Sequence, residues 1–149
     1  MLKEAIAIII LGLSLQQASA QAAGPSIVGQ WLEIDDDTKA PDALIEIREK
    51  DGVISGTIIK LFLDPGEPAN PGCTKCTGKR KDQPLIGMTV IENVRHNGGT
   101  YEGGTILDPE TGRTYRVILA PSPDGHDLSV TGYVGLPAFG ETRHWKRAP

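Results

Sequence analysis

Two cysteines separated by two residues are the most chemically suggestive feature of this chain. Cys73 and Cys76 lie in the segment NPGCTKCTGKRKD, residues 70–82, and are its only cysteines. A Cys-x-x-Cys pair is typical of zinc sites, of thiol redox catalysts and, in c-type cytochromes, of haem attachment. Thr77 occupies the position of the haem-binding histidine, which excludes haem attachment in its usual form.

The surroundings of the pair favour a disulfide. A thioredoxin-like catalyst would need the first cysteine at the start of a helix in a βαβ unit, and the sequence predicts neither. Zinc would need two further ligands, and the chain has no second Cys-x-x-Cys. Two cysteines this close form a disulfide in an oxidising compartment, so we predict a Cys73–Cys76 bond, with zinc as the alternative. A ring this short contributes only about 2 kcal/mol of loop entropy.

Four basic side chains surround the cysteines, namely Lys75, Lys79, Arg80 and Lys81. The ordinary interpretation is a solvated charged loop. The sharper hypothesis is a local rim that attracts anions near one end of the domain, since a few clustered cations act locally even on an acidic protein.

The remaining polar residues predict no catalytic residue, metal or cofactor. A Gly-x-Ser-x-Gly elbow is missing from the sequence. His96 and His126 fall in predicted turns and His144 on the last predicted strand, with no evident carboxylate partner. The acidic run at residues 35–37 and the pair Asp108 and Glu110 predict solvated turns, with a glycosidase-like or calcium site as the alternative, although EF-hand spacing is lacking. An enzyme is therefore the less favoured class.

The first twenty residues predict a secretory signal peptide. The apolar run of residues 5–15 is followed by small residues at Ala18 and Ala20, which predicts cleavage before Gln21. This run is too short for a membrane helix, which needs roughly 20 residues. We therefore expect a periplasmic or secreted bacterial protein with no transmembrane segment in its mature chain.

Charge and length narrow the classes further. The chain has 15 basic and 19 acidic residues and a net charge of -4, which argues against nucleic acid as a partner. Residues 21–149 have the length of one domain.

Short segments rich in β-branched residues, separated by turn residues, predict an all-β fold. The strand candidates are residues 26–34, 43–50, 53–63, 84–94, 100–107, 113–120, 127–134 and 141–147. Turn residues such as Asp51-Gly52 between them predict hairpins. Because closure removes exposed edges, we predict one eight-stranded antiparallel up-and-down barrel. The connection at 64–83 is long enough to suggest a functional or disordered loop.

Several motifs resemble the exported bacterial family called domain of unknown function 2147. They are LDPGEPANPGCTKC, LIGM, YEGGTILDPETGRTY and GYVGLPAFGETRHW, and together with GQW they cover nearly the whole mature chain. The resemblance implies a lipocalin-like barrel without an established activity. GQW near the start and TRHWKR near the end also resemble the lipocalin pattern of a tryptophan packed against a C-terminal arginine.

That pattern implies barrel closure by Trp31 with Arg143 and Trp145, with Arg147 as the alternative arginine. Strand alternation predicts an orientation of Trp31 that conflicts with this closure. Leu32 and Ile34 form an apolar alternation, which predicts that Trp31 faces outward unless the strand is bulged.

The predicted fold and the predicted export together favour a carrier or binding protein for a small, partly apolar ligand. The residues expected to line its site are Trp31, Met88, Tyr115 and Tyr133. Two alternatives stay open: an exported enzyme that uses the Cys-x-x-Cys loop for redox or metal-assisted chemistry, and an envelope interaction protein whose barrel is filled. The sequence identifies neither the ligand nor the oligomeric state.

Overall fold

The computed structural model describes residues 24–149. The predicted signal peptide and its cleavage site before Gln21 lie outside the described residues. The strands are β1 (Gly29–Ile34), β2 (Pro41–Lys50), β3 (Val53–Leu61), β4 (Thr89–Asn97), β5 (Thr100–Asp108), β6 (Arg113–Pro121), β7 (Asp127–Tyr133) and β8 (Glu141–Arg147), with two short 3-10 helices, η1 (Gly78–Arg80) and η2 (Pro137–Phe139).

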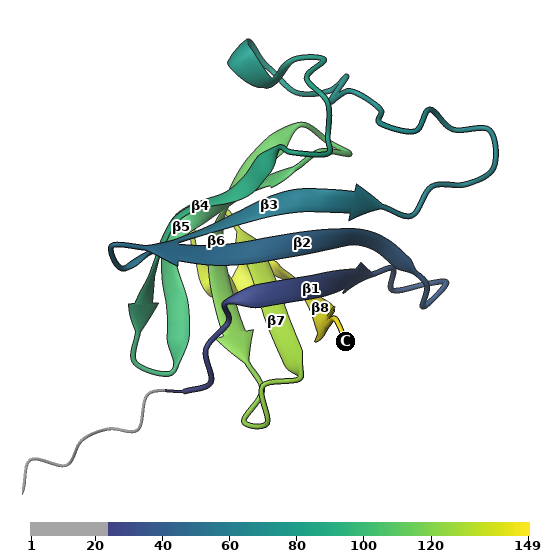
Figure 1. Cartoon of the computed structure of the whole chain (residues 1–149). Coiled ribbons are helices and arrows are strands. Elements are labelled where there is room, and N and C mark those ends of the chain that lie inside the picture. The colour runs from purple at the N-terminus through teal and green to yellow at the C-terminus, as the bar shows by residue number, and fades with distance from the viewer. Residues whose placement is uncertain (1–23) are drawn as a thin grey trace, which may run out of the picture.

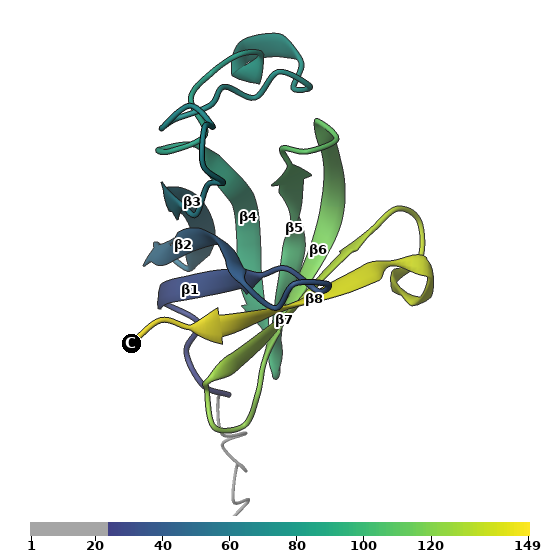
Figure 2. The same ribbon diagram turned by 90° about the vertical axis from the view of Figure 1, so that its right-hand side faces the viewer.

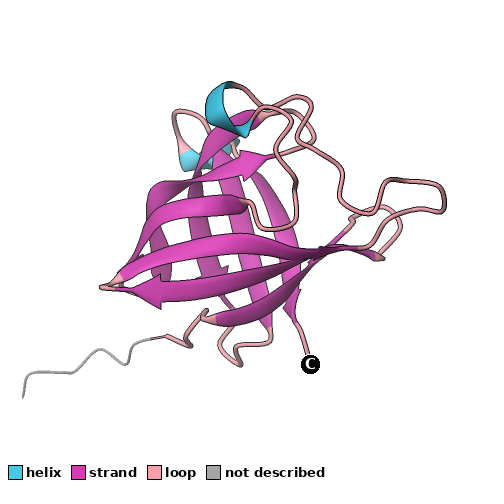
Figure 3. Ribbon diagram, turned by 45° about the horizontal axis from the view of Figure 1, so that its top comes forward, coloured by secondary structure: helices cyan, strands magenta, loops and turns pink. Residues whose placement is uncertain are grey.

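The strands form one closed antiparallel barrel in which each strand pairs with its neighbours in the sequence (Figures 1 and 3). Closure comes from β1 and β8, where Trp31 is the register partner of Arg147 and Glu33 that of Trp145. The predicted eight-stranded antiparallel up-and-down barrel is thus confirmed. In the part of the chain that the structure describes, no helix is both long and apolar enough to cross a membrane.

The fourth strand begins later than the sequence predicts. It starts at Thr89, whereas Pro84 forms only an isolated bridge with Gly72. Proline has no N–H to donate to a ladder, and Gly87 adopts a φ of 93° that suits a turn. The long connection therefore extends over residues 62–88.

The two ends of the barrel differ in their connections (Figures 1 and 2). One end, here called the hairpin end, carries short turns. The other, here called the long-loop end, carries the 62–88 connection, the β5–β6 turn and the η2 segment, which projects sideways in Figure 2. The hairpin end comprises turns 51–52, 98–99 and 122–126, and the long-loop end comprises residues 35–40, 62–88, 109–112 and 134–140.

Apolar side chains fill the half of the barrel nearer the hairpin end. Trp31, Ile27 and Ile47 are fully buried there, and the Trp31 Nε1 donates a hydrogen bond of 2.8 Å to the Ile27 carbonyl. Leu119 and Leu128, on β6 and β7, are also fully buried. This half of the interior is a packed core.

Arg147 seals the hairpin end over the Trp31 ring. Its guanidinium donates to the carbonyl oxygens of Ser26 at 2.7 Å, Gly125 at 2.7 Å and Val28 at 3.1 Å. The expectation that Arg143 packs on Trp31 is therefore wrong, and the alternative, Arg147, holds. Arg143 lies four residues nearer the long-loop end and instead pairs with Asp36.

Candidate functional site

The inward face of β1 carries a carboxyl group. Trp31 is fully buried and directly paired with Ile45 of the core, so alternation places Glu33 on the same inward face. Leu32 and Ile34 consequently face outward. The expected orientation of β1 is thus wrong, because its apolar alternation marks the outer face of the strand.

Glu33 lies among buried neighbours on both sides. Its register partners are Ala43 on β2 and Trp145 on β8, both buried. Directly paired residues of antiparallel strands share one face of the sheet, so these three side chains point into the barrel together. Burial raises the pKa of Glu33 to about 7, Asp42 acts in the same direction, and Arg143 opposes them.

Trp145 has the second polar group of this region. The residue is 2% exposed, and its Nε1 is the one buried side-chain nitrogen or oxygen among residues 24–149 that lacks a hydrogen-bond partner. An unpartnered buried donor costs free energy comparable to a lost hydrogen bond. Glu33 and Trp145 therefore form a polar pair in the half of the barrel nearer the long-loop end.

Carboxylates dominate the long-loop end around this pair. Burial, followed by the negative charge of Asp35, raises the pKa of Asp42. Arg143 lies 3.6 Å from Asp36 in an ion pair. An open hollow of about 330 Å³ adjoins this ion pair, lined by Asp36, Asp37, Glu141, Thr142 and Arg143. The charges that act most strongly on Glu33 are therefore mostly negative, and Arg143 opposes them.

The four residues expected to line a ligand site are not brought together. Trp31 belongs to the packed core at the hairpin end. Met88 is buried and also lines an open groove of about 380 Å³ beside β4. Tyr115 pairs with Ile106 across β5 and β6 and shares the inward face of Val117, which is buried in the core. Of the four, Tyr115 has the orientation that a wall residue on the long-loop side requires.

Tyr133 is wrong as a wall residue. Val130 is buried in the barrel core, and Tyr133 lies three positions later, so its side chain points outward. Arg116 on β6 lies over its ring, with the Cζ atom 5.6 Å from the ring centre. A Cβ at Gly140 would lie 2.9 Å from the Tyr133 Cβ, so the chain that leads into β8 packs closely against Tyr133 outside the barrel.

The two cysteines form the predicted disulfide, with sulfur atoms 1.97 Å apart. Cys73 and Cys76 are 1% and 3% exposed. The Cys73 N–H donates to the Gln83 carbonyl at 2.8 Å, and the Asp82 N–H donates to the Cys73 carbonyl at 3.0 Å. A redox catalyst needs a sulfur that its partner can reach, so this geometry favours a bridge that shapes the loop.

The disulfide loop is held against the β5–β6 turn. Gly112 has a φ of 71°, and a Cβ there would overlap the carbonyl oxygen of Lys75. The Sγ of Cys73 lies 3.7 Å from the Pro109 carbonyl oxygen on the same turn. The disulfide loop thus packs onto the long-loop end. The connection that the sequence predicts to be either functional or disordered is therefore ordered.

The basic residues of this loop are partly neutralised. Arg80 pairs with Glu92 at 2.6 Å, and Lys81 lies 3.5 Å from Asp82. Lys75 and Lys79 are exposed. The anion-attracting rim stays a prediction, with two of its four cations beside carboxylates.

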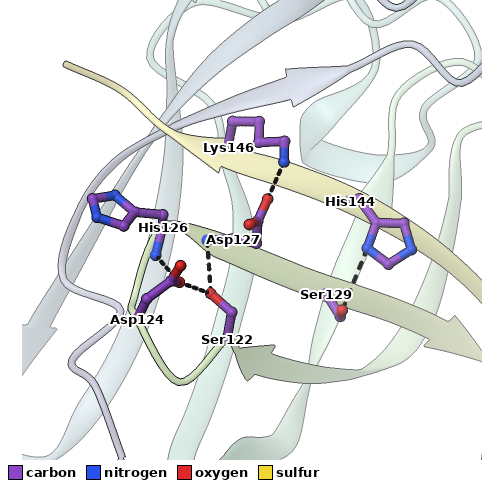
Figure 4. A network of polar contacts seen from close by, with 7 residues as sticks. All are labelled: Ser122, Asp124, His126, Asp127, Ser129, His144 and Lys146. Carbon is purple, nitrogen blue, oxygen red and sulfur yellow. Dashed lines mark hydrogen bonds and ion pairs between the residues drawn. The ribbon is translucent and has the colours of Figure 1, made fainter.

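Of the two histidines in Figure 4, the His144 ring reaches a serine hydroxyl and the His126 ring does not. The Asp124 carboxylate accepts from the Ser122 hydroxyl at 2.6 Å and from the His126 backbone N–H at 3.0 Å, which is a turn motif, and the His126 ring points away from it. The His144 Nδ1 lies 3.4 Å from the Ser129 hydroxyl on the exposed face. Within residues 24–149, no three His, Cys, Asp or Glu side chains are grouped to hold a metal ion.

Sequence reasoning missed Glu33 and gave Trp145 only a closure role. The available signal was the spacing of Trp31 and Glu33, because residues two apart on a strand share a face. Had Trp31 been placed inside on the strength of the GQW pattern, Glu33 would have followed it into the barrel.

The chain is similar to one described family and to one solved barrel structure. Residues 29–147 match the family described as "Uncharacterized protein conserved in bacteria (DUF2147)". A search of curated proteins found no match. Among solved structures, protein HP1028 from the human pathogen Helicobacter pylori, described as belonging to the lipocalin family, superposes with a TM-score of 0.70 at 20% identity, covering 83% of this chain and 84% of that chain. At this identity the similarity shows the fold alone.

Proposed function

The chain belongs to the bacterial family DUF2147, and from its lipocalin-like barrel we propose that it is an exported, periplasmic protein that binds or carries a small molecule. The ligand is partly apolar and lies in the half of the barrel nearer the long-loop end. The half nearer the hairpin end is already filled by side chains such as Trp31 and Leu128.

One observation carries the proposal. The half-buried Glu33 carboxyl and the unpartnered Trp145 Nε1 share the inward face of adjacent strands. Ligand sites are typically apolar pockets in which a few polar groups fix the orientation of the ligand. A packed core gains nothing from the Trp145 Nε1, because a donor that is buried without a partner costs free energy.

Native mass spectrometry of the protein purified from its own envelope tests the proposal. We expect the folded protein to have the mass of the chain plus one small molecule. The same protein refolded from denaturant serves as the control and should lack the added mass. A folded protein from the envelope with the mass of the bare chain would contradict the proposal.

Export is tested separately by cell fractionation and N-terminal sequencing. We expect the protein in the osmotic-shock fraction with Gln21 as its first residue, because the residues before it have the form of a signal peptide. Recovery of the chain from the cytoplasm with Met1 or Lys3 still attached would contradict export.

An envelope interaction protein is the second candidate, and one observation favours it. Val134, Leu136 and Phe139, around η2 at the long-loop end, are 73%, 62% and 82% exposed. Exposed apolar clusters often mark interaction surfaces. This candidate expects a filled barrel, so it predicts the bare chain mass where the carrier predicts a bound molecule.

A further inference from the structure

We propose that the Glu33–Trp145 pair selects a small organic cation that carries an oxygen acceptor. The cationic group pairs with the Glu33 carboxylate, and the oxygen accepts a hydrogen bond from the Trp145 Nε1. This inference rests on the proposed function, since it names the class of ligand that the barrel takes.

The charges around Glu33 favour a cation. Among the groups that act on this carboxyl, Asp42 on β2 and Asp108 and Glu110 at the β5–β6 turn are acidic, and Arg143 on β8 is the one base. Arg143 is itself paired with Asp36. An anionic ligand would meet like charges here, whereas a cation is attracted.

The other elements packed around Glu33 add one further base on this face, Arg113 of β6, which is the register partner of Asp108. The β1–β2 turn contributes Asp35 and Asp36, and the start of β8 contributes the exposed Glu141 beside the hollow. Tyr115 on β6 and Val130 on β7 present a phenol and an alkyl group. Around Glu33 the acidic side chains therefore outnumber the two bases, Arg113 and Arg143.

Desolvation of Glu33 gives a cation an advantage over a neutral ligand. Burial raises the pKa of this carboxyl to about 7, because it removes much of the water that stabilises the charged form. A cation stabilises the charged form in place of that water, so binding favours the ionised form and releases the proton. A neutral ligand leaves the carboxylate as it was.

Trp145 specifies the second group of the ligand. Its Nε1 can only donate, and no acceptor among residues 24–149 reaches it. A ligand oxygen in that position would satisfy a donor whose burial otherwise costs free energy. The ligand class thus combines a positive charge with a hydroxyl, ether or carbonyl oxygen, as amino alcohols and their ethers do.

Three matched probes test this inference by isothermal titration calorimetry on the mature protein. (Phenoxyethyl)trimethylammonium, phenoxyethanol and phenoxyacetate share the phenoxy oxygen and differ in charge. We expect the cation to bind at least about tenfold more tightly than phenoxyethanol, and phenoxyacetate to bind most weakly. Since the ammonium and the alcohol do not titrate, any pH dependence of their binding comes from the protein.

The pH dependence needs no variant. With an apparent pKa of about 7 for the free Glu33, the cation should bind about tenfold more weakly at pH 6 than at pH 8, and about half a proton should be released per cation bound at pH 7. Phenoxyethanol should bind equally at both pH values. A cation affinity that does not change with pH would overturn the role of Glu33.

Two variants separate the contributions. Glu33→Gln should make the cation bind no more tightly than phenoxyethanol. The affinity for phenoxyethanol should stay unchanged. Glu49→Gln, an exposed carboxylate on β2 near the hairpin end, is the charge-matched control and should retain the advantage. Trp145→Phe should weaken the binding of the cation and the binding of phenoxyethanol alike by several-fold, because both ligands present the same oxygen.

The outcomes distinguish the two levels of the proposal. If none of the three probes binds and no small molecule is found on the protein from the envelope, the carrier function fails and the cation inference fails with it. If phenoxyethanol or phenoxyacetate binds as tightly as the cation, the carrier function stands and the cation inference is overturned. Unchanged affinities in Trp145→Phe would overturn the assignment of the oxygen.

Discussion

The guanidinium of Arg147 lies over the Trp31 ring, with its Cζ 4.3 Å from the ring centre. The two residues are register partners across β1 and β8, the strands that close the barrel. A cation in this position adds roughly 0.5 to 2 kcal/mol to the larger free energy from burial of the ring. The contact thus joins the first and last strands, β1 and β8, where the barrel closes.

Trp31→Ala should lower the free energy of unfolding by about 3 to 5 kcal/mol, because it removes a fully buried ring and leaves a cavity. Trp31→Phe should cost clearly less. Urea unfolding followed by circular dichroism measures both. A Trp31→Ala protein as stable as wild type would contradict closure through this contact.

Arg147→Lys should cost about 1 to 3 kcal/mol, because an ammonium cannot reach three carbonyl oxygens in the geometry of the guanidinium. Arg143→Lys is the matched control on the same strand. Arg143 is 49% exposed in its ion pair, so this change should stay within about 0.5 kcal/mol of wild type. Equal losses in the two variants would refute the assignment of Arg147 as the closing arginine.

The sequence predicts the closing strands but not which arginine meets Trp31. Arg143 and Arg147 lie on the same face of β8, so local pattern cannot separate them. The choice depends on the register between β1 and β8, which the barrel as a whole determines. For the same reason GQW and TRHWKR predict the closure of the barrel without predicting the contact.

The inward face of β1 could not be read from hydrophobicity. Leu32 and Ile34 give the strand an apolar stripe on its outer face, while Glu33 enters the barrel beside Trp31. Binary patterning fails here because a carboxyl occupies a core position, and such violations are expected at functional sites. The number and order of the eight strands, in contrast, follow from local signals and agree with the structure, apart from the late start of β4.

Glu33→Gln should change how stability depends on pH. The unfolded chain titrates near the ordinary pKa of 4.5, whereas burial raises the folded pKa to about 7. The folded protein therefore binds this proton more tightly, and its contribution to stability is lost as pH rises from 4.5 to 7. Glutamine cannot lose a proton, so the variant should exceed wild type by up to about 3 kcal/mol above pH 7.

Denaturant unfolding between pH 4 and pH 9 measures this difference, which should disappear below pH 4.5. Glu49→Gln controls for the change in net charge and should follow wild type across the range. If the wild-type and Glu33→Gln curves stay parallel, Glu33 does not titrate as the buried geometry requires.

Replacing both cysteines by alanine should cost about 2 kcal/mol, since the bridged ring is short. The larger effect should be local. Amide exchange should become faster in residues 72–84, which the bridge holds together, and stay unchanged in the paired strands. Wild type treated with a phosphine reductant should behave like the variant. Loss of the whole barrel on reduction would contradict a bridge that only shapes the loop.

The two tryptophans should respond differently when each is changed to phenylalanine in the ligand-free protein. Both are buried, but the Trp31 Nε1 donates to the Ile27 carbonyl and the Trp145 Nε1 has no partner in residues 24–149. Each change removes a similar part of the ring, so the difference comes from the hydrogen bond of Trp31 and from the weaker attraction of a phenyl ring for Arg147. Trp31→Phe should therefore cost about 1 kcal/mol more than Trp145→Phe.

Urea unfolding of protein refolded from denaturant measures this difference without a bound ligand. With (phenoxyethyl)trimethylammonium at saturation, the difference in unfolding free energy between the two variants should become smaller. Wild type and Trp31→Phe gain a hydrogen bond to the ligand oxygen, whereas Trp145→Phe has no N–H to donate. If Trp145→Phe already costs as much as Trp31→Phe in the ligand-free protein, then the Trp145 Nε1 has a partner of its own. The oxygen acceptor would then have to be dropped from the ligand class.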